Sequence, residues 1–255
     1  MSGSLVVVGI GPGSVDLLTP AATRVLRGAT DLVGYGPYLD RISEIVPGQR
    51  RHPSDNRVEI ERARLALTLA AEGGKVAVVS GGDPGVFAMA AAVFEAIEGG
   101  DPNWRELDIR VEPGITAVLA AAAEVGAPLG GDFCAISLSD NLKSWETVER
   151  RLRAAAEADF VIALYNPASK ARPHQLGRAF ELLRTIKSPQ TVVVFVKRAA
   201  TPETHVIVTA LAEADAVVAD MRTLVIIGAT ATRLMPRKGQ RPWVYTPRAE
   251  QGAVR

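Results

Sequence analysis

Short apolar runs alternate with longer amphipathic stretches along this chain. The first run, Leu5–Val8, is continuous and mostly β-branched, which predicts a buried strand. The stretch 56–71 instead interleaves apolar positions with glutamates and arginines, which favours an amphipathic helix closed by Gly73 and Gly74. A chain that alternates strands with helices in this way is expected to form a mostly parallel sheet with right-handed crossovers.

Further elements follow from the same patterns in both halves of the chain. The expected strands are Asp31–Gly34, Lys75–Val79, Leu107–Val111, Phe133–Leu138, Phe160–Tyr165, Thr191–Val196, His205–Val208 and Thr223–Ile227. The expected helices are one that starts at Thr19-Pro20 and stops at Gly28, one over Val86–Ile97, an alanine-rich one that ends at Val125, and two over Trp145–Ala156 and Pro173–Ile186. A Gly/Pro cluster at 126–131 is the predicted junction between two α/β lobes, 1–125 and 132–255.

Composition narrows the class of protein. The chain has 29 basic and 28 acidic residues, so its net charge is close to zero. This balance gives no reason to expect nucleic acid or an anionic membrane as a partner. A single cysteine, Cys134, excludes an internal disulfide and a Cys-rich metal site, and its place in an expected strand favours a core role. The apolar runs are too short for a signal peptide or a membrane span, so a cytoplasmic protein without a metal site is expected.

Two glycine-rich turns follow strands of the first lobe. One is Gly9–Gly13, and the other is Ser80–Phe87, which contains Asp83 and Pro84. Turn chemistry alone favours such residues. Both turns should nevertheless lie at the carboxyl edge of one sheet, where open α/β sheets bind ligands.

The first glycine loop departs from the nucleotide-binding patterns. Ser14 stands where the third glycine of a dinucleotide fingerprint belongs, and Gly34-Tyr35-Gly36 replaces the acidic residue that would hold a ribose. No Gly-Lys-Ser/Thr follows, so a P-loop is excluded. The loop is interpreted as backbone that lines the binding site of a bulky organic ligand. An NAD-dependent oxidoreductase is disfavoured.

A third polar turn, Leu164-Tyr165-Asn166-Pro167, follows a strand of the second lobe. Its position suits a ligand site between lobes, although an ordinary Asn-Pro turn with solvated basic residues remains an alternative.

Three segments, in this order, resemble the signatures of the tetrapyrrole (corrin/porphyrin) methylases: Gly9–Gly13, Gly82–Pro84 and Pro113–Ala117. The match runs over essentially the whole chain. The branch of the family that acts on corrin precursors is favoured by the runs Gly34–Leu39, Glu59–Arg64, Asp83–Ala90 and Leu164–Ser169.

The resemblance implies a homodimer of the class III S-adenosylmethionine methyltransferase type, with the ligand cleft between its two α/β lobes. It implies S-adenosyl-L-methionine as cofactor, S-adenosyl-L-homocysteine as product, and a tetrapyrrole substrate with several carboxylates. The cofactor-binding residues that it implies are Pro12, Gly81, Gly82, Asp83, Val86, Thr116, Ala117, Leu164, Tyr165 and Ala199. The Asp83 carboxylate is expected to accept hydrogen bonds from the ribose hydroxyls or the amino group of the cofactor.

Residues for catalysis and substrate binding are nominated by position. The candidate general acids or bases are Tyr35, Tyr38, Asn166 and His52, each of which has an alternative role in a turn or in packing. The candidates for the substrate carboxylates are Arg51, Lys170, Arg172 and Arg198, for which solvated surface charge is the alternative.

Two departures from the family patterns bear on the substrate. Members that methylate uroporphyrinogen carry an aspartate where this chain has Gly36, which argues against that substrate. Gly81 stands where a serine is expected. A cobalt-containing or metal-free corrin precursor, and a non-catalytic tetrapyrrole carrier, all remain open.

Overall fold

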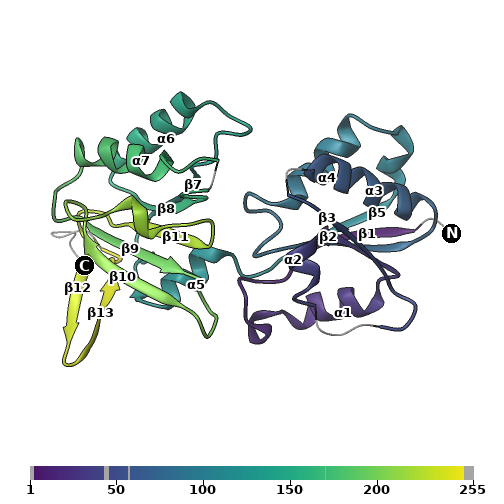
Figure 1. The fold of residues 1–255 in the computed structure, drawn as a ribbon, viewed down its shortest axis with the longest axis horizontal. Coiled ribbons are helices and arrows are strands. Elements are labelled where there is room, and N and C mark those ends of the chain that lie inside the picture. Colours follow the sequence, from purple (N-terminus) through teal and green to yellow (C-terminus); the bar gives the residue numbers. More distant parts are fainter. Residues whose placement is uncertain (1–2, 43–45, 57, 170, 250–255) are drawn as a thin grey trace. The chain divides into compact units, whose positions relative to one another are not determined.

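The computed structural model describes residues 3–42, 46–56, 58–169 and 171–249. The chain divides into two compact units, Met1–Ala117 and Val118–Arg255. Each unit combines a five-stranded sheet with helices, so the predicted α/β class is confirmed (Figure 1).

The first unit contains a wholly parallel sheet with the strand order β3-β2-β4-β1-β5. Its strands are β1 (Ser4–Gly9), β2 (Asp31–Tyr35), β3 (Arg50–Ser54), β4 (Lys75–Ser80) and β5 (Asp108–Glu112). Its helices are α1 (Pro20–Gly28), α2 (Gly36–Leu39), α3 (Glu59–Ala71) and α4 (Met89–Glu98), with 3-10 turns at Val15–Leu17 and Pro102–Glu106. Parallel pairing brings the carboxyl ends of all five strands to one edge.

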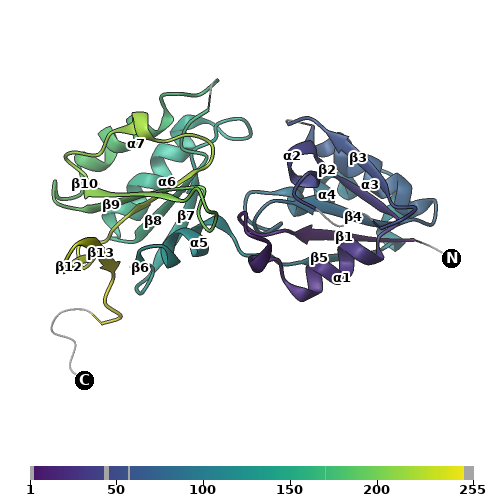
Figure 2. The same ribbon diagram turned by 60° about the horizontal axis from the view of Figure 1, so that its bottom comes forward.

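Helices cover both faces of this sheet, with α1 on one face and α3 and α4 on the other (Figure 2). Leu5 and Val7 of β1 pack with α3 and α4, whereas Val8 packs with α1. Because alternate side chains of a strand point to opposite faces, burial on both faces explains the continuous apolar run of β1.

Local sequence explains where these helices begin. The Thr19 hydroxyl accepts a hydrogen bond from the Ala22 amide at 3.0 Å, and Pro20 occupies the first turn of α1, as predicted. Helix α4 begins at Met89, three residues later than predicted, because Phe87 takes a left-handed φ of 52° that no α-helix allows.

The second unit contains a mixed sheet with the order β10-β9-β11-β8-β7. Its strands are β7 (Phe133–Ser137), β8 (Val161–Tyr165), β9 (Val192–Lys197), β10 (His205–Ala210) and β11 (Thr223–Ile227). The pair β7–β8 is parallel, whereas β11 runs antiparallel between β8 and β9, and β10 is antiparallel to β9. The expectation of a mostly parallel sheet therefore holds for the first unit and not for the second.

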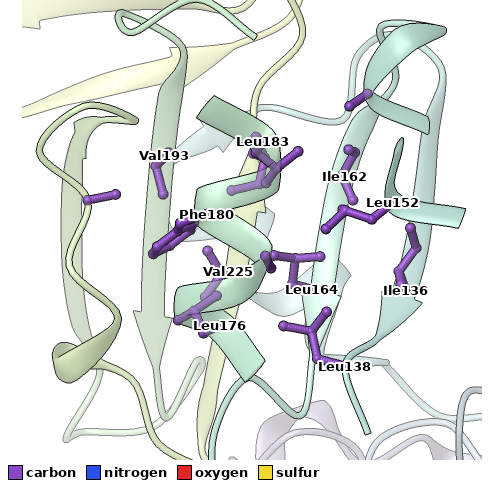
Figure 3. Close-up of a cluster of buried hydrophobic side chains, with 14 of the residues drawn as sticks. Ile136, Leu138, Leu152, Ile162, Leu164, Leu176, Phe180, Leu183, Val193 and Val225 are labelled. Carbon is purple, nitrogen blue, oxygen red and sulfur yellow. The ribbon is translucent and has the colours of Figure 1, made fainter. Parts of the chain in front are cut away.

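The physical reason lies in the connections of the second sheet. No long helix separates β9, β10 and β11 in the part of the chain described, so these strands return without the crossover that parallel pairing needs. Strands β7, β8 and β9 still point the same way, so their carboxyl ends share one edge. Helices α6 (Trp145–Glu157) and α7 (Gln175–Arg184) cover one face, where Phe180 lies close to Val193 and Val225 (Figure 3).

The predicted junction at 126–131 lies inside the second unit. Helix α5 (Ala117–Ala123) leads into β6 (Gly126–Ala127), which pairs with β13 (Gln240–Tyr245), and β13 pairs with β12 (Arg233–Arg237). Gly126 has a φ of 130°, and a Cβ built there would lie 2.8 Å from the Val244 carbonyl oxygen. The glycine thus serves a close strand pairing and not a linker. Within the described ranges, no helix is long and apolar enough to cross a membrane.

Candidate functional site

The two glycine turns of the first unit meet at the carboxyl edge of its sheet. The Gly11 amide donates to the Gly82 carbonyl at 3.2 Å, and the Gly82 amide donates to the Gly11 carbonyl at 2.9 Å. Gly82 has a φ of 66°, in the region that favours glycine. The predicted meeting of the two turns is confirmed.

The third segment, Pro113–Ala117, closes against the other two through bare backbone. A Cβ built on Gly114 would lie 2.3 Å from the Gly82 carbonyl oxygen and 2.9 Å from the Gly9 Cα. A Cβ built on Gly82 would lie 3.8 Å from the Thr116 Cα. The three segments are therefore in contact, and glycine is required where they cross.

The Asp83 carboxylate joins two of these segments. Its Oδ1 accepts a hydrogen bond from the Gly85 amide at 2.8 Å, and its Oδ2 accepts one from the Gly114 amide at 3.0 Å. Each carboxylate oxygen can accept a further bond, because an ionised carboxylate has about four acceptor positions. Asp83 is thus a bridge between segments and retains capacity for a ligand.

Two tyrosines stand where β2 ends. The rings of Tyr35 and Tyr38 make an edge-to-face contact, with centroids 5.3 Å apart and planes at 89°. A Cβ built on Gly81 would lie only 2.7 Å from Cζ of Tyr38. The Tyr38 ring therefore occupies the space that a side chain at position 81 would need.

Two arginines that the sequence did not predict support this edge. Arg41 donates to the carbonyl oxygens of Ile10 and Gly11, at 3.2 and 2.9 Å. Arg62 is 5% exposed and donates to the Ser54 hydroxyl and the Asp55 carbonyl, at 2.7 and 2.6 Å.

Burial lowers the pKa of both the Arg41 and the Arg62 guanidinium. The charged residues of α3 had indicated a solvent-facing side for Arg62, so its burial had no signal in the sequence.

His52 and Arg51 of β3 are engaged elsewhere. His52 Nε2 lies 2.8 Å from Oδ1 of Asp31, the first residue of β2, whereas Tyr35 is the last residue of β2. Arg51 donates to the carbonyls of Leu39 and Ile42, at 3.2 and 2.8 Å, just after α2. The structure therefore separates His52 from the tyrosines and uses Arg51 to satisfy backbone carbonyls.

Asp31 is fully buried at the amino edge of this sheet. Burial alone would raise its pKa, but hydrogen bonds from Arg50, His52 and Thr30 outweigh burial and hold the pKa below its ordinary value. This cluster lies at the opposite end of β2 from the glycine turns.

The carboxyl edge of the second unit is built differently. The Tyr165 hydroxyl accepts a hydrogen bond from the Val118 amide at 3.0 Å, and the Asn166 side-chain amide donates to the Ser137 hydroxyl at 2.9 Å. The Leu164 side chain is fully buried in the core of the sheet, so it offers a ligand only its backbone.

The loop after β9 adds strained backbone to the same edge. Arg198 and Ala200 have φ values of 52° and 58° on either side of the buried Ala199. The Ala200 amide donates to Oε1 of Glu124 at 3.0 Å, which fixes this loop to the end of α5. Glu124 had no distinguishing signal in the sequence.

The candidate substrate cations of the second unit have local acidic partners. Arg172 is 3.6 Å from Oδ1 of Asp140 and also contacts the Ser139 hydroxyl. Arg198 forms an ion pair with Glu203. Lys170 lies outside the described residues.

The remaining candidates divide between the two units. At the carboxyl edge of the first unit are Pro12, Gly81, Gly82, Asp83, Val86, Thr116 and Ala117. At the corresponding edge of the second unit are Tyr165, Asn166 and Ala199.

Cys134 lies half-buried against the core of the second unit, as predicted, and burial raises the pKa of its thiol. Among the described residues, no three His, Cys, Asp or Glu side chains are grouped as metal ligands.

The fold and the glycine segments define a known class. The family model for Tetrapyrrole (Corrin/Porphyrin) Methylases matches residues 4–234, and this chain belongs to that family. The precorrin-3B C(17)-methyltransferase of a Sinorhizobium species is 57% identical over 253 residues, which cover 99% of each chain. The probable cobalt-factor III C(17)-methyltransferase of Salmonella typhimurium is 42% identical, over 89% of this chain and 93% of that protein. The crystal structure of the methyltransferase CobJ superposes with a TM-score of 0.91 and 55% identity, over 96% of this chain and 100% of CobJ.

Proposed function

We propose that the protein transfers a methyl group from S-adenosyl-L-methionine to C17 of precorrin-3B, with ring contraction to precorrin-4, in cobalamin biosynthesis. The observation that carries the proposal is the contact of the three signature segments through Gly9, Gly82 and Gly114. The 57% identical relative, named for this reaction, supports the choice of substrate.

The residues of the first unit fit an adenosine-containing cofactor. Gly82 presents bare backbone beside Thr116, and Asp83 has acceptor capacity left for hydroxyl or amino groups. We propose that these residues, with Pro12 and Val86, hold the cofactor, and that Tyr165 and Ala199 add contacts from the second unit. When bound, S-adenosyl-L-methionine supplies an electrophilic methyl group on a sulfonium.

The chain's own contribution to methyl transfer is positioning. An in-line displacement between two bound reactants needs near-attack geometry more than a covalent protein group. The segments are well suited to this task, because paired backbone hydrogen bonds and Asp83 link them. In the proposed ring contraction, one ring bond of C20 breaks and a bond forms between the two ring carbons that flank C20. The hydroxyl oxygen on C20 becomes the carbonyl oxygen of an acetyl group, so the hydroxyl proton must be removed. Tyr35, Tyr38 and Asn166 remain the candidates for that step.

The substrate carboxylates require cations. We propose Arg172 and Arg198, together with Lys170, for this role. The acidic partners Asp140 and Glu203 are themselves partly solvent-accessible, so a substrate carboxylate can replace them at modest cost. We further propose that the enzyme works as a cytoplasmic homodimer, as the family resemblance implies.

A second candidate reaction is C17 methylation of cobalt-factor III. It is favoured by the 42% identical relative from Salmonella typhimurium, which is named for that substrate. The two reactions use the same cofactor and position, and they differ in the cobalt of the tetrapyrrole.

One anaerobic assay tests both candidates. The protein is incubated with S-adenosyl-L-methionine and either precorrin-3B or cobalt-factor III, and the products are followed by mass and absorption spectrum. The proposal expects one added methyl group on precorrin-3B and the spectrum of the contracted ring. Methyl transfer to cobalt-factor III alone would make that compound the substrate in place of precorrin-3B. Methyl transfer to neither compound would overturn the proposed function.

A further inference from the structure

Tyr38 has a more constrained setting than the other nominated side chains. Its ring lies against the bare Cα of Gly81, in the second signature, and makes an edge-to-face contact with Tyr35. The ring is therefore held on two sides, and this packing fixes the direction in which its hydroxyl points.

The Tyr38 hydroxyl makes no hydrogen bond to any of the residues that the structure describes. Burial raises the pKa of this phenol, so it stays protonated at neutral pH and can donate a hydrogen bond. The residue is still 36% exposed, which leaves it open to a ligand. A held donor without an acceptor among the described residues is suited to a bound molecule.

The charges around Tyr38 indicate which molecule that is. The guanidinium groups of Arg41 and Arg62 both act on the phenol. Neither forms an ion pair with a described residue, although the Glu59 carboxylate acts on Arg62 from a greater distance. S-adenosyl-L-methionine carries a sulfonium, an ammonium and one carboxylate, so its net charge is positive and two cations disfavour it as a whole. A tetrapyrrole with several carboxylates is attracted by the same pair.

We infer that the Tyr38 hydroxyl donates a hydrogen bond to an oxygen of the tetrapyrrole, and that Gly81 is a specificity feature because its missing side chain makes room for the Tyr38 ring. The inference rests on the proposed function and adds a substrate contact to it. It also accounts for the glycine at position 81, where the family pattern predicts serine: a serine Cβ would displace the ring.

The first test is Tyr38→Phe, which keeps the ring and its packing but removes the donor. We expect the KM for the tetrapyrrole to rise about 10- to 100-fold, the range for a hydrogen bond to a charged group. The Kd of S-adenosyl-L-homocysteine, measured by calorimetry, should change by less than about twofold. The matched control is Tyr245→Phe on β13, which should leave both constants unchanged. An unchanged KM, or an equal loss of S-adenosyl-L-homocysteine affinity, would overturn the inference.

The second test separates the role of Gly81 from that of the backbone around it. Gly81→Ala places a Cβ against Cζ of Tyr38, so it should raise the KM for the tetrapyrrole by a factor similar to Tyr38→Phe. In a Tyr38→Ala background the space is free, and Gly81→Ala should then change the KM by less than about twofold. The same effect of Gly81→Ala in both backgrounds would contradict the pairing.

These outcomes are distinguishable from failure of the proposed function. The variants are assayed with whichever of precorrin-3B and cobalt-factor III the parent protein methylates. A parent that methylates one of them while Tyr38→Phe is unaltered overturns only the inference. A parent that methylates neither overturns the proposed function and, with it, the assigned substrate contact.

Discussion

The carboxyl edges of the two sheets are built by different means. In the first unit, Gly9, Gly82 and Gly114 let backbones touch each other directly. In the second unit, side chains such as Asn166 and Glu124 hold loops in place, and several residues other than glycine accept positive φ angles. Contacts between backbones require glycine, so they can be recognised in the sequence. Contacts through side chains tolerate many residue types, so they cannot be recognised in the sequence.

The largest effect that tests this difference is expected for Gly114→Ala. The new Cβ would meet the Gly82 carbonyl oxygen at 2.3 Å, and the neighbouring atoms are backbone that has little room to move. We expect the free energy of unfolding, measured with urea, to fall by about 3 kcal/mol or more.

The matched control is Gly177→Ala in α7, where a Cβ meets nothing within 4 Å. That variant should gain about 0.5 to 1 kcal/mol, because alanine favours helix. A Gly114→Ala protein as stable as the parent would remove the basis for the contrast between the two edges.

A smaller effect of opposite sign is expected in the second unit from Ala200→Gly. Ala200 has a φ of 58°, which costs a residue with a Cβ about 1 to 2 kcal/mol. Glycine would relieve this cost, but it is also more flexible in the unfolded chain, which offsets part of the relief. The free energy of unfolding of the variant should therefore rise by up to about 1 kcal/mol. Ala154→Gly, on the exposed side of α6, should instead lose about 1 kcal/mol. A loss at Ala200 as large as at Ala154 would show that the loop is not strained.

The smallest effect is a change in the pH dependence of stability, and it concerns the opposite end of β2. The folded pKa of Asp31 is held below its ordinary value of 3.8. Its contribution to stability is therefore fully present above that value and is lost as the pH falls through the lower folded pKa. Asp31→Asn should weaken the dependence of unfolding free energy on pH below about 4, as measured by urea unfolding at several pH values. An unaltered pH dependence would mean that the Asp31 cluster is not an ion-pair site.

Much of the fold is readable from patterns that have a simple physical cause. The continuous apolar run of β1 predicts a strand because both faces of the first sheet are covered. Strand β3 was missed because Arg50–Ser54 is a polar edge strand that contains a proline, and such strands have no apolar run. The hairpin β12–β13 was missed for a similar reason, since most of its residues are exposed.

Some residues of the candidate site could be predicted from the sequence and others could not. The glycines of the three segments were found because their spacing and order are distinctive. His52 was nominated from its place in a polar stretch, and only the strand β3 reveals that its side chain turns toward Asp31. Arg41, Arg62 and Glu124 act through contacts with residues far apart in the chain or through burial, which one sequence does not reveal.

The central claim is that the three joined segments of the first unit bind the cofactor, and Asp83 is their common element. Titration of S-adenosyl-L-homocysteine into the parent and into folded Asp83→Ala, by calorimetry, tests it directly. Loss of the carboxylate leaves the Gly85 and Gly114 amides unpaired and removes the acceptor for the ligand, so affinity should fall at least about 10-fold. Equal affinity of the two proteins for S-adenosyl-L-homocysteine would contradict the account.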